Sequence, residues 1–226
     1  MDNPTRENIV ERSVQVTTDQ VTLEGNLRFP EKIEGMVVFV HGSGSSRLSP
    51  RNQYVARQLQ EGGLATLLFD LLTREEEQVD MVTRHLRFDI DLLAQRTIGA
   101  VDWLSQQTYA RELNIGLFGS STGAAAALIA AAERSQLVHA VVSRGGRPDL
   151  AGPALPHVKA PTLFIVGEQD RVVIDLNEGA MGEMSPEVEK RLEIVPGASH
   201  LFEEPGTLEQ AAGLARGWFR RILTAT

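Results

Sequence analysis

The chain has 226 residues, of which 42% are hydrophobic, and we expect a single domain over residues 1–226 with a substantial core. Its formal net charge of -8 argues against nucleic acid or an anionic membrane surface as the main partner. The absence of cysteine excludes disulfides, thiolate catalysis and zinc–thiolate sites, and the five histidines show no metal-ligand spacing.

The sequence predicts neither a signal peptide nor a membrane span. Residues 1–6 precede no apolar core of a signal peptide, and the apolar runs are too short to span a bilayer. We therefore expect a cytoplasmic protein that acts on a small molecule and needs no cofactor.

The first half of the chain predicts a β-hairpin and then alternating strands and helices. Runs 13–17 and 21–28 have strand character and flank the turn residues Thr18, Asp19 and Gln20. Further along we expect, in chain order, strand 36–40, helix 52–62, strand 64–69, an irregular charged segment 70–84 and helix 88–106.

The second half continues this alternation. We expect, in chain order, strand 114–118, helix 124–132, strands 138–142 and 162–166, a helix near 186–190, strand 191–195 and a final helix 208–223. Strands that alternate with helices predict a mostly parallel sheet of about seven or eight strands with helices on both faces. The initial hairpin adds antiparallel strands, so the sheet is expected to be mixed.

Residues 119–123 have the G-x-S-x-G spacing, with Ser121 midway between two glycines. This spacing alone is common in Gly-rich loops, but here a predicted strand precedes it and an Ala-rich helix follows, which is the context of a nucleophile elbow. So tight a turn holds the serine hydroxyl above the sheet edge, and the backbone N–H of Thr122 then points toward a developing oxyanion. Ser121 is therefore the candidate nucleophile.

A serine nucleophile needs a general base, and three histidines follow it in the chain. His139 lies within a predicted strand, which favours a packed or hydrogen-bonded role, and His157 lies in a Pro-rich connection, which favours a surface loop. His200 follows strand 191–195 and the breaker Pro196-Gly197, so it lies beyond the carboxyl end of a strand, where open α/β sheets bind ligands. We choose His200 as the base.

The acid that orients the base is expected between the serine and the histidine in the chain. Asp170 follows the apolar strand 162–166 and a short polar turn, and we choose it over Glu168, although an aspartate here also suits plain turn stabilisation. Glu203 and Glu204 follow the histidine too closely, and we expect them to be solvated or to begin the last helix.

The Gly-rich loop after strand 36–40 is the expected source of a second oxyanion N–H donor. We assign this donor to Ser43 and expect His41 to brace the loop. A phosphate-binding loop is disfavoured, because no Lys-Ser/Thr pair follows and the G-x-G-x-x-G register fails.

These motifs together resemble the α/β-hydrolase superfamily, and more narrowly its small dienelactone hydrolase-like members. The resemblance covers about residues 12–222 and rests on loop 41–46, segments 69–73 and 87–90, elbow 119–123, turn 167–170 and loop 197–200. It implies an α/β-hydrolase fold with Ser121, Asp170 and His200 as a catalytic triad. Dienelactone hydrolases use a cysteine nucleophile, so the serine here favours an esterase-like member.

The resemblance leads us to expect hydrolysis of a small carboxylic ester through an acyl-enzyme. The connection 143–160 is too short for a cap domain, and segment 71–87 either overhangs the pocket or forms a solvated loop. Thioesters, lactones and short peptides stay open as substrates, as do a non-catalytic binding module and a structural role in a complex. Each of the following residues is a candidate either for the apolar lining of the pocket or for the core: Leu71, Leu72, Met181, Met184, Leu201 and Phe202.

Overall fold

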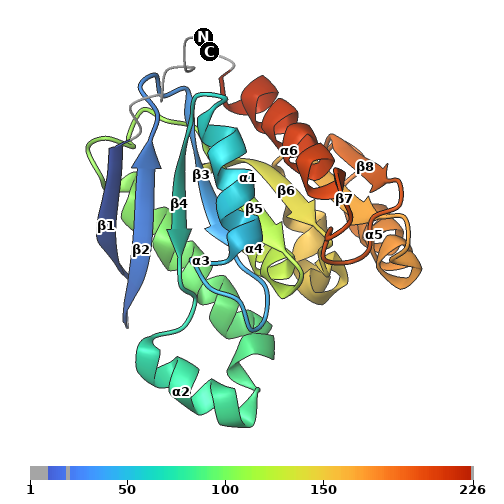
Figure 1. The fold of residues 1–226 in the computed structure, drawn as a ribbon, viewed down its shortest axis with the longest axis horizontal. Helices are drawn as coiled ribbons and strands as arrows, with labels where there is room; N and C mark the ends of the chain where they lie inside the picture. Colours follow the sequence, from blue (N-terminus) through green and yellow to red (C-terminus); the bar gives the residue numbers. More distant parts are fainter. Residues whose placement is uncertain (1–9, 19–20, 225–226) are drawn as a thin grey trace.

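A computed structural model describes residues 10–18 and 21–224, and in this part of the chain eight strands form one sheet with helices on both faces (Figure 1). Parallel pairing of central strands with antiparallel N-terminal strands confirms the predicted mixed sheet. The strands are β1 (Val10–Thr17), β2 (Thr22–Phe29), β3 (Gly35–Val40), β4 (Leu64–Phe69), β5 (Ile115–Ser120), β6 (Val138–Arg144), β7 (Thr162–Gly167) and β8 (Lys190–Val195).

The strand order is β1-β2-β4-β3-β5-β6-β7-β8. The β1–β2 hairpin and the β2–β4 pair are antiparallel, whereas the strands from β4 to β8 pair in parallel. The predicted hairpin is thus confirmed, while Asp19 and Gln20 of its turn, like residues 1–9, lie outside the described residues. Because the last strands all run the same way, their carboxyl ends and the loops that follow them meet at one edge of the sheet.

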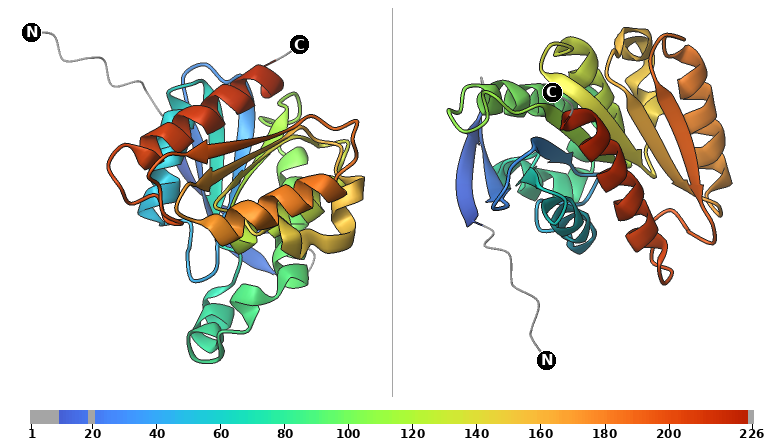
Figure 2. Two further views of the ribbon diagram at one scale, coloured as in Figure 1. Left: turned by 90° about the vertical axis from the view of Figure 1, so that its right-hand side faces the viewer. Right: turned by 90° about the horizontal axis from the view of Figure 1, so that it is seen from above.

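Two layers of helices enclose this sheet. The helical segments are α1 (Pro50–Gln60), α2 (Arg74–Thr83), η1 (Leu86–Phe88), α3 (Ile90–Ser105), α4 (Thr122–Glu133), η2 (Pro148–His157), α5 (Arg171–Glu183) and α6 (Thr207–Leu223). Helices α1 and α6 lie on one face and α3 and α4 on the other, while α2 projects beyond the sheet edge (Figures 1 and 2). None of the helices in the described ranges is long and apolar enough to cross a membrane.

The central strands are buried on both sides, as their continuous apolar sequences require. In β3, Val37 and Phe39 pack in the core that includes side chains of α1 and α6, whereas Met36 and Val38 pack with those of α3 and α4. This alternation follows from the two-residue period of a strand. The two cores hold the sheet rigid, so the loops at its carboxyl edge have a fixed platform.

The prediction of an irregular segment at residues 70–84 was wrong, because α2 forms there. Thr73 Oγ1 accepts a hydrogen bond from Glu76 N, and the Glu76 carboxylate accepts one from Thr73 N, which is a capping box. Three glutamates in the first turn also favour the positive end of the helix dipole. The helix buries only Asp80, so it lacks the apolar stripe that would have revealed it.

The predicted helix near residues 186–190 was also wrong. Residues 186–189 form a turn, Lys190 begins β8, and the helix lies earlier, as α5. Val173, Asn177 and Ala180 of α5 are buried at helical spacing. The apolar periodicity of α5 is weak, because one of its buried positions holds a polar asparagine and its second half contains two glycines. The helix was therefore not predicted.

Candidate active site

Ser121 joins the end of β5 to the start of α4 in a strained conformation. Its backbone has φ of 51° and ψ of -125°, a region that residues with a Cβ rarely adopt. Such a conformation costs on the order of 1–3 kcal/mol and persists only where the surrounding fold enforces it. The strand, the turn and the helix predicted around this serine are therefore all present.

The two flanking glycines are needed because the turn is crowded. A Cβ on Gly119 would lie 2.5 Å from Ala124 Cα, and one on Gly123 would lie 2.2 Å from the carbonyl oxygen of Val40. Both contacts are with backbone atoms, which cannot swing aside as a flexible side chain can. The G-x-S-x-G spacing thus reflects the close approach of α4 to β3 and β5.

His200 and Asp170 form a hydrogen-bonded pair beyond the carboxyl ends of β8 and β7. His200 Nδ1 lies 2.5 Å from Asp170 Oδ2, and the carboxylate is the partially buried member. Because the Nδ1–H donates to the carboxylate, Nε2 is the ring nitrogen left to accept a proton. The structure therefore brings together the acid and the base chosen from the sequence.

Glu168, the alternative acid, has a different role. Its Oε2 accepts a hydrogen bond of 2.8 Å from the backbone N–H of Gly197. The neighbouring Gln169 bonds the same turn through its side chain, with Nε2 2.8 Å from the Gly197 oxygen. These contacts hold the loop that carries His200.

Glu204 also holds this loop, from the other side. Its Oε2 accepts a 2.9 Å hydrogen bond from Ser199 N, and this backbone hydrogen bond lowers the pKa of Glu204. Its backbone oxygen accepts from Thr207, the first residue of α6. Glu203 lies in an exposed ion pair with Arg51, so of the two glutamates only Glu203 approaches the solvated role expected from the sequence.

Ser121 and His200 line the same cavity, which has a volume of about 250 Å³. Ser43 and Leu201 also line it. Within the described residues, no hydrogen bond joins the Ser121 hydroxyl to His200. In sites without substrate the hydrogen bonds of catalysis are often long and tighten only when the complex forms.

Of the two predicted oxyanion donors, Ser43 lines this cavity, and Thr122 directly follows the lining residue Ser121. Thr122 is the first residue of α4, so its N–H has no partner within the helix and points out of its positive end. Ser43 lies on the loop after β3, beside Gly42, where an added Cβ would come within 3.0 Å of Ser121 Cβ. The loop that carries Ser43 therefore packs directly against the nucleophile.

His41 braces this loop from within the protein. Its Nδ1 lies 2.9 Å from the Gly42 carbonyl oxygen, and its Nε2 accepts a 3.1 Å hydrogen bond from Leu71 N. A ring that donates through one nitrogen and accepts through the other is neutral. Burial is the main cause that lowers the pKa of His41, and it acts in the same direction. The side chain ties the loop after β3 to the end of β4.

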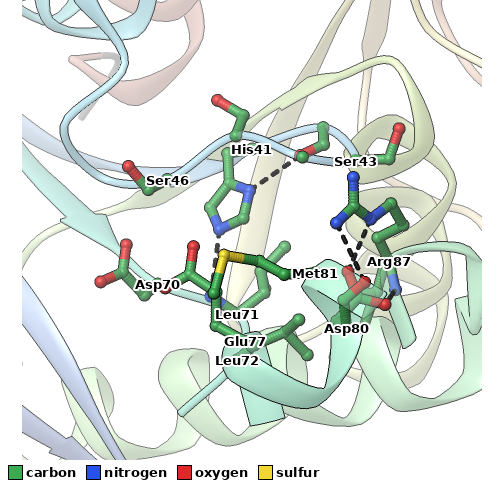
Figure 3. A pocket seen from close by; sticks show the side chains of 14 residues that line it. His41, Ser43, Ser46, Asp70, Leu71, Leu72, Glu77, Asp80, Met81 and Arg87 are labelled. Atoms are coloured by element: carbon green, nitrogen blue, oxygen red, sulfur yellow. Dashed lines mark hydrogen bonds and ion pairs between the residues drawn. The ribbon is translucent and has the colours of Figure 1, made fainter. Parts of the chain in front are cut away.

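A second cavity of about 260 Å³ lies on the other side of loop 41–46 and is walled by α2 and η1 (Figure 3). Leu71, Leu72 and Met81 supply apolar surface, and the buried Asp80 is joined to Arg87 by a 2.6 Å ion pair. Gly42, Ser43 and Ser45 line both cavities. Residues of segment 71–87 therefore form part of the wall of this second cavity, while most of the segment is exposed to solvent.

The expected apolar lining is present only in part. Leu71 and Leu72 line the second cavity, and Leu201 lines the cavity of Ser121. Met184 and Phe202 are buried in the core, and Met181 packs against it, so these three take the core position that was the alternative to lining the pocket. Met81 takes that role instead, from a helix that the sequence analysis did not predict.

The remaining histidines lie away from the site. His139 is exposed, and its ring nitrogen accepts a 3.4 Å hydrogen bond from Ile115 N. His157 is exposed at the end of η2, in agreement with its expected surface position. In residues 10–18 and 21–224, no cluster of three or more metal-ligating side chains is found.

The residues of the Ser121 cavity that were missed in the sequence include Arg51, Asn52 and Arg144. Arg144 is the last residue of β6, so the rule that selected Ser121, Asp170 and His200, a position at the carboxyl end of a strand, also applies to it. Arg51 and Asn52 belong to the first turn of α1 and carry no comparable signal.

The comparison with protein families is decisive on ancestry, because the sequence model of the dienelactone hydrolase family matches residues 23–223. The chain belongs to the dienelactone hydrolase family. Its fold has no cap domain, since only η2 lies between β6 and β7. A solved family member, described as a dienelactone hydrolase from Anabaena variabilis ATCC 29413, is 59% identical, with a TM-score of 0.93 over 95% of this chain and 99% of that one.

Two further kinds of relative match the chain: longer proteins of similar sequence and a solved structure of low sequence identity. Two proteins of Mycobacterium tuberculosis, which carry the provisional name phosphoribosyl transferase, are 56% identical over 209 residues. This match covers 92% of the chain but only 46% of each of those proteins, so the chain spans about half their length. Est1E from Butyrivibrio proteoclasticus is 16% identical with a TM-score of 0.75, over 92% of this chain and 98% of that one, and it shows the same fold.

Proposed function

We propose that this member of the dienelactone hydrolase family is a serine hydrolase that cleaves small carboxylic esters through an acyl-enzyme. The observation that carries the proposal is the 2.5 Å hydrogen bond between His200 and Asp170, on the wall of the cavity that also contains the strained Ser121. If His200 and Ser121 had only structural roles, neither the elbow beside the histidine nor the backbone strain at the serine would be needed, so a catalytic role explains both features.

The acylation step uses five groups at the sheet edge. His200 Nε2 takes the hydroxyl proton of Ser121 as the serine oxygen attacks the ester carbonyl. The N–H groups of Ser43 and Thr122 stabilise the oxyanion that develops on the carbonyl oxygen. Asp170 keeps the ring in the correct tautomer and stabilises the imidazolium. His200 then protonates the leaving alcohol as the tetrahedral intermediate collapses.

Deacylation repeats the same proton transfers with water. His200 deprotonates a water molecule that attacks the acyl-enzyme, and as the second tetrahedral intermediate collapses His200 returns this proton to the leaving Ser121 oxygen and the carboxylic acid is released. Splitting the reaction in this way replaces one difficult displacement with two easier ones.

Two alternatives concern the group that is cleaved. A thioester or a lactone would be attacked by the same triad, and the relative from Anabaena variabilis is named for lactone hydrolysis. The transferase name of the Mycobacterium tuberculosis relatives belongs to chains of which this match covers 46%, so that name does not favour a transferase here. Location in the cytoplasm stays a prediction.

The test is steady-state hydrolysis of 4-nitrophenyl acetate by wild type, Ser121→Ala and the matched neighbour Ser120→Ala. Removing a nucleophile that acts with its base should lower kcat by several orders of magnitude, to about the rate left by the oxyanion hole and binding. Ser120 lies outside the motif frame, so its replacement should lower kcat by less than about tenfold. Equal rates for wild type and Ser121→Ala would refute the proposal.

A further inference from the structure

The cavity beside Ser121 contains a buried positive charge with no acidic partner. Arg144, at the end of β6, is only 6% exposed and lines this cavity. Among the residues that the structure describes, no carboxylate forms an ion pair with Arg144, and its Nε has no hydrogen-bond partner. Buried arginines are normally paired, so an unpaired one at a substrate cavity is unusual.

The surroundings of Arg144 compensate its charge only in part. Burial is the main cause that lowers the pKa of this guanidinium to about 10, and the nearby Arg51 acts in the same direction. In the described part of the chain, the ring of Phe202 is a favourable partner, and its centroid lies 5.4 Å from the guanidinium carbon. A ring face stacks on a guanidinium but leaves its in-plane N–H donors unused.

The start of α1 adds further donors to the same cavity. Ser49 caps this helix, and Arg51 and Asn52 of its first turn line the cavity. Asn52 is 2% exposed, and its Oδ1 has no hydrogen-bond partner in the described chain. Since the two ends of an amide are assigned from their partners, this side chain can present its NH₂ group to a ligand. A helix N-terminus also favours negative charge.

The nearby carboxylates of Glu203 and Asp170 do not neutralise the positive charge of this cavity. Glu203 is 3.3 Å from Arg51, but its side chain is 62% exposed, and an exposed pair of this kind is weak. Asp170 is engaged by His200. The cavity therefore has an excess of positive charge within a protein whose net charge is -8.

We propose that this part of the cavity is a subsite for a phosphate group of the substrate, bound by Arg144, Arg51 and Asn52. The inference rests on the proposed function, because it specifies the ester as one that also carries a phosphate. Two guanidinium groups, an amide and a helix N-terminus match a dianion with three terminal oxygens, whereas a carboxylate, with two oxygens, needs one guanidinium fork.

Binding is measured without catalysis, in the Ser121→Ala protein, by calorimetric titration with phenyl phosphate at constant ionic strength. Adding Arg51→Gln should weaken binding about ten- to a hundredfold, because a charged hydrogen-bond donor is lost. Arg144→Gln should weaken it as much, and Arg144→Lys less. The control is Arg111→Gln, an exposed arginine far from the cavity, which should leave the affinity unchanged.

Two binding results would overturn the inference: no detectable binding of phenyl phosphate, or the same affinity in Arg51→Gln as in its parent. Replacing the buried Arg144 also removes packing from the core, whereas Arg51 is partly exposed, so the Arg51→Gln result is decisive on its own. Benzoate that binds as tightly as phenyl phosphate would refute the choice of phosphate.

A second arm uses matched esters. The ratio of kcat/KM for 4-nitrophenyl 3-phosphonopropionate to that for 4-nitrophenyl butyrate should fall about tenfold or more in Arg51→Gln. If wild type cleaves both esters but binds no phenyl phosphate, only the phosphate subsite is refuted. If phenyl phosphate binds and no ester is cleaved, the subsite stands and the proposed hydrolase function fails.

Discussion

Replacing Gly123 with alanine tests the geometry of the elbow without touching a reacting group. The added Cβ would lie 2.2 Å from the Val40 oxygen and 2.5 Å from the His41 oxygen, so α4 and the end of β3 would have to separate by about 1 Å. The matched change is Gly213→Ala in α6, where an added Cβ meets nothing within 4 Å. Both changes replace a helical glycine with alanine, so they differ only in crowding.

The two variants should change stability in opposite directions. Gly213→Ala should stabilise by about 0.5–1 kcal/mol, because alanine loses less backbone entropy in a helix. Gly123→Ala should destabilise by about 3 kcal/mol, since rigid backbone must move, and this lowers Tm by roughly 6–12 °C for a chain of this size.

Urea unfolding followed by circular dichroism gives both free energies, and the rate of 4-nitrophenyl acetate hydrolysis gives the effect on the site. Gly123→Ala should also lose activity out of proportion to its stability, because the displaced residues carry the Ser43 loop. A Gly123→Ala protein as stable as Gly213→Ala would refute the close approach on which the elbow geometry depends.

Three further predictions concern the acid, the loop and the pocket wall. Asp170→Asn should fold normally but lower kcat by about four orders of magnitude, because the amide selects the wrong tautomer of His200, and steady-state kinetics measures this. Burial lowers the pKa of His41, so the unfolded chain binds a proton near pH 6.5 that the folded chain does not, and stability should fall as the pH is lowered through that value. Urea midpoints at about pH 7.5 and about pH 5.5 should therefore differ more in wild type than in His41→Asn. Met81→Trp fills part of the cavity beside α2, so it should lower the ratio of kcat/KM for 4-nitrophenyl hexanoate to that for 4-nitrophenyl acetate about tenfold, if this cavity receives the acyl chain of the ester. An unchanged ratio would show that the acyl chain binds outside this cavity.

The parts of the fold that could be predicted are those in which local pattern and burial agree. The central strands are apolar throughout because both faces are covered, and Ser121 follows one of them at a spacing that only a sharp turn explains. Asp170 and His200 followed from chain order and from their positions after strands. Each of these signals lies within a few residues of the group it identifies.

The parts that could not be predicted depend on contacts between distant segments. Helix α2 has almost no apolar face, so its presence was readable only from the Thr73–Glu76 capping box. The pocket residues Asn52 and Arg144 become neighbours only because α1 begins beside the end of β6. No local pattern distinguishes a buried asparagine that faces a cavity from one that caps a turn.

The central claim is that one serine is activated, and a fluorophosphonate probe followed by peptide mass spectrometry tests it most directly. Such a probe reacts covalently with a serine whose proton a neighbouring base removes. The proposed mechanism predicts a single adduct on Ser121, absent in Ser121→Ala and strongly slowed in a His200→Gln protein that retains its fold. An unlabelled wild-type protein, or an adduct that persists in Ser121→Ala, would contradict it.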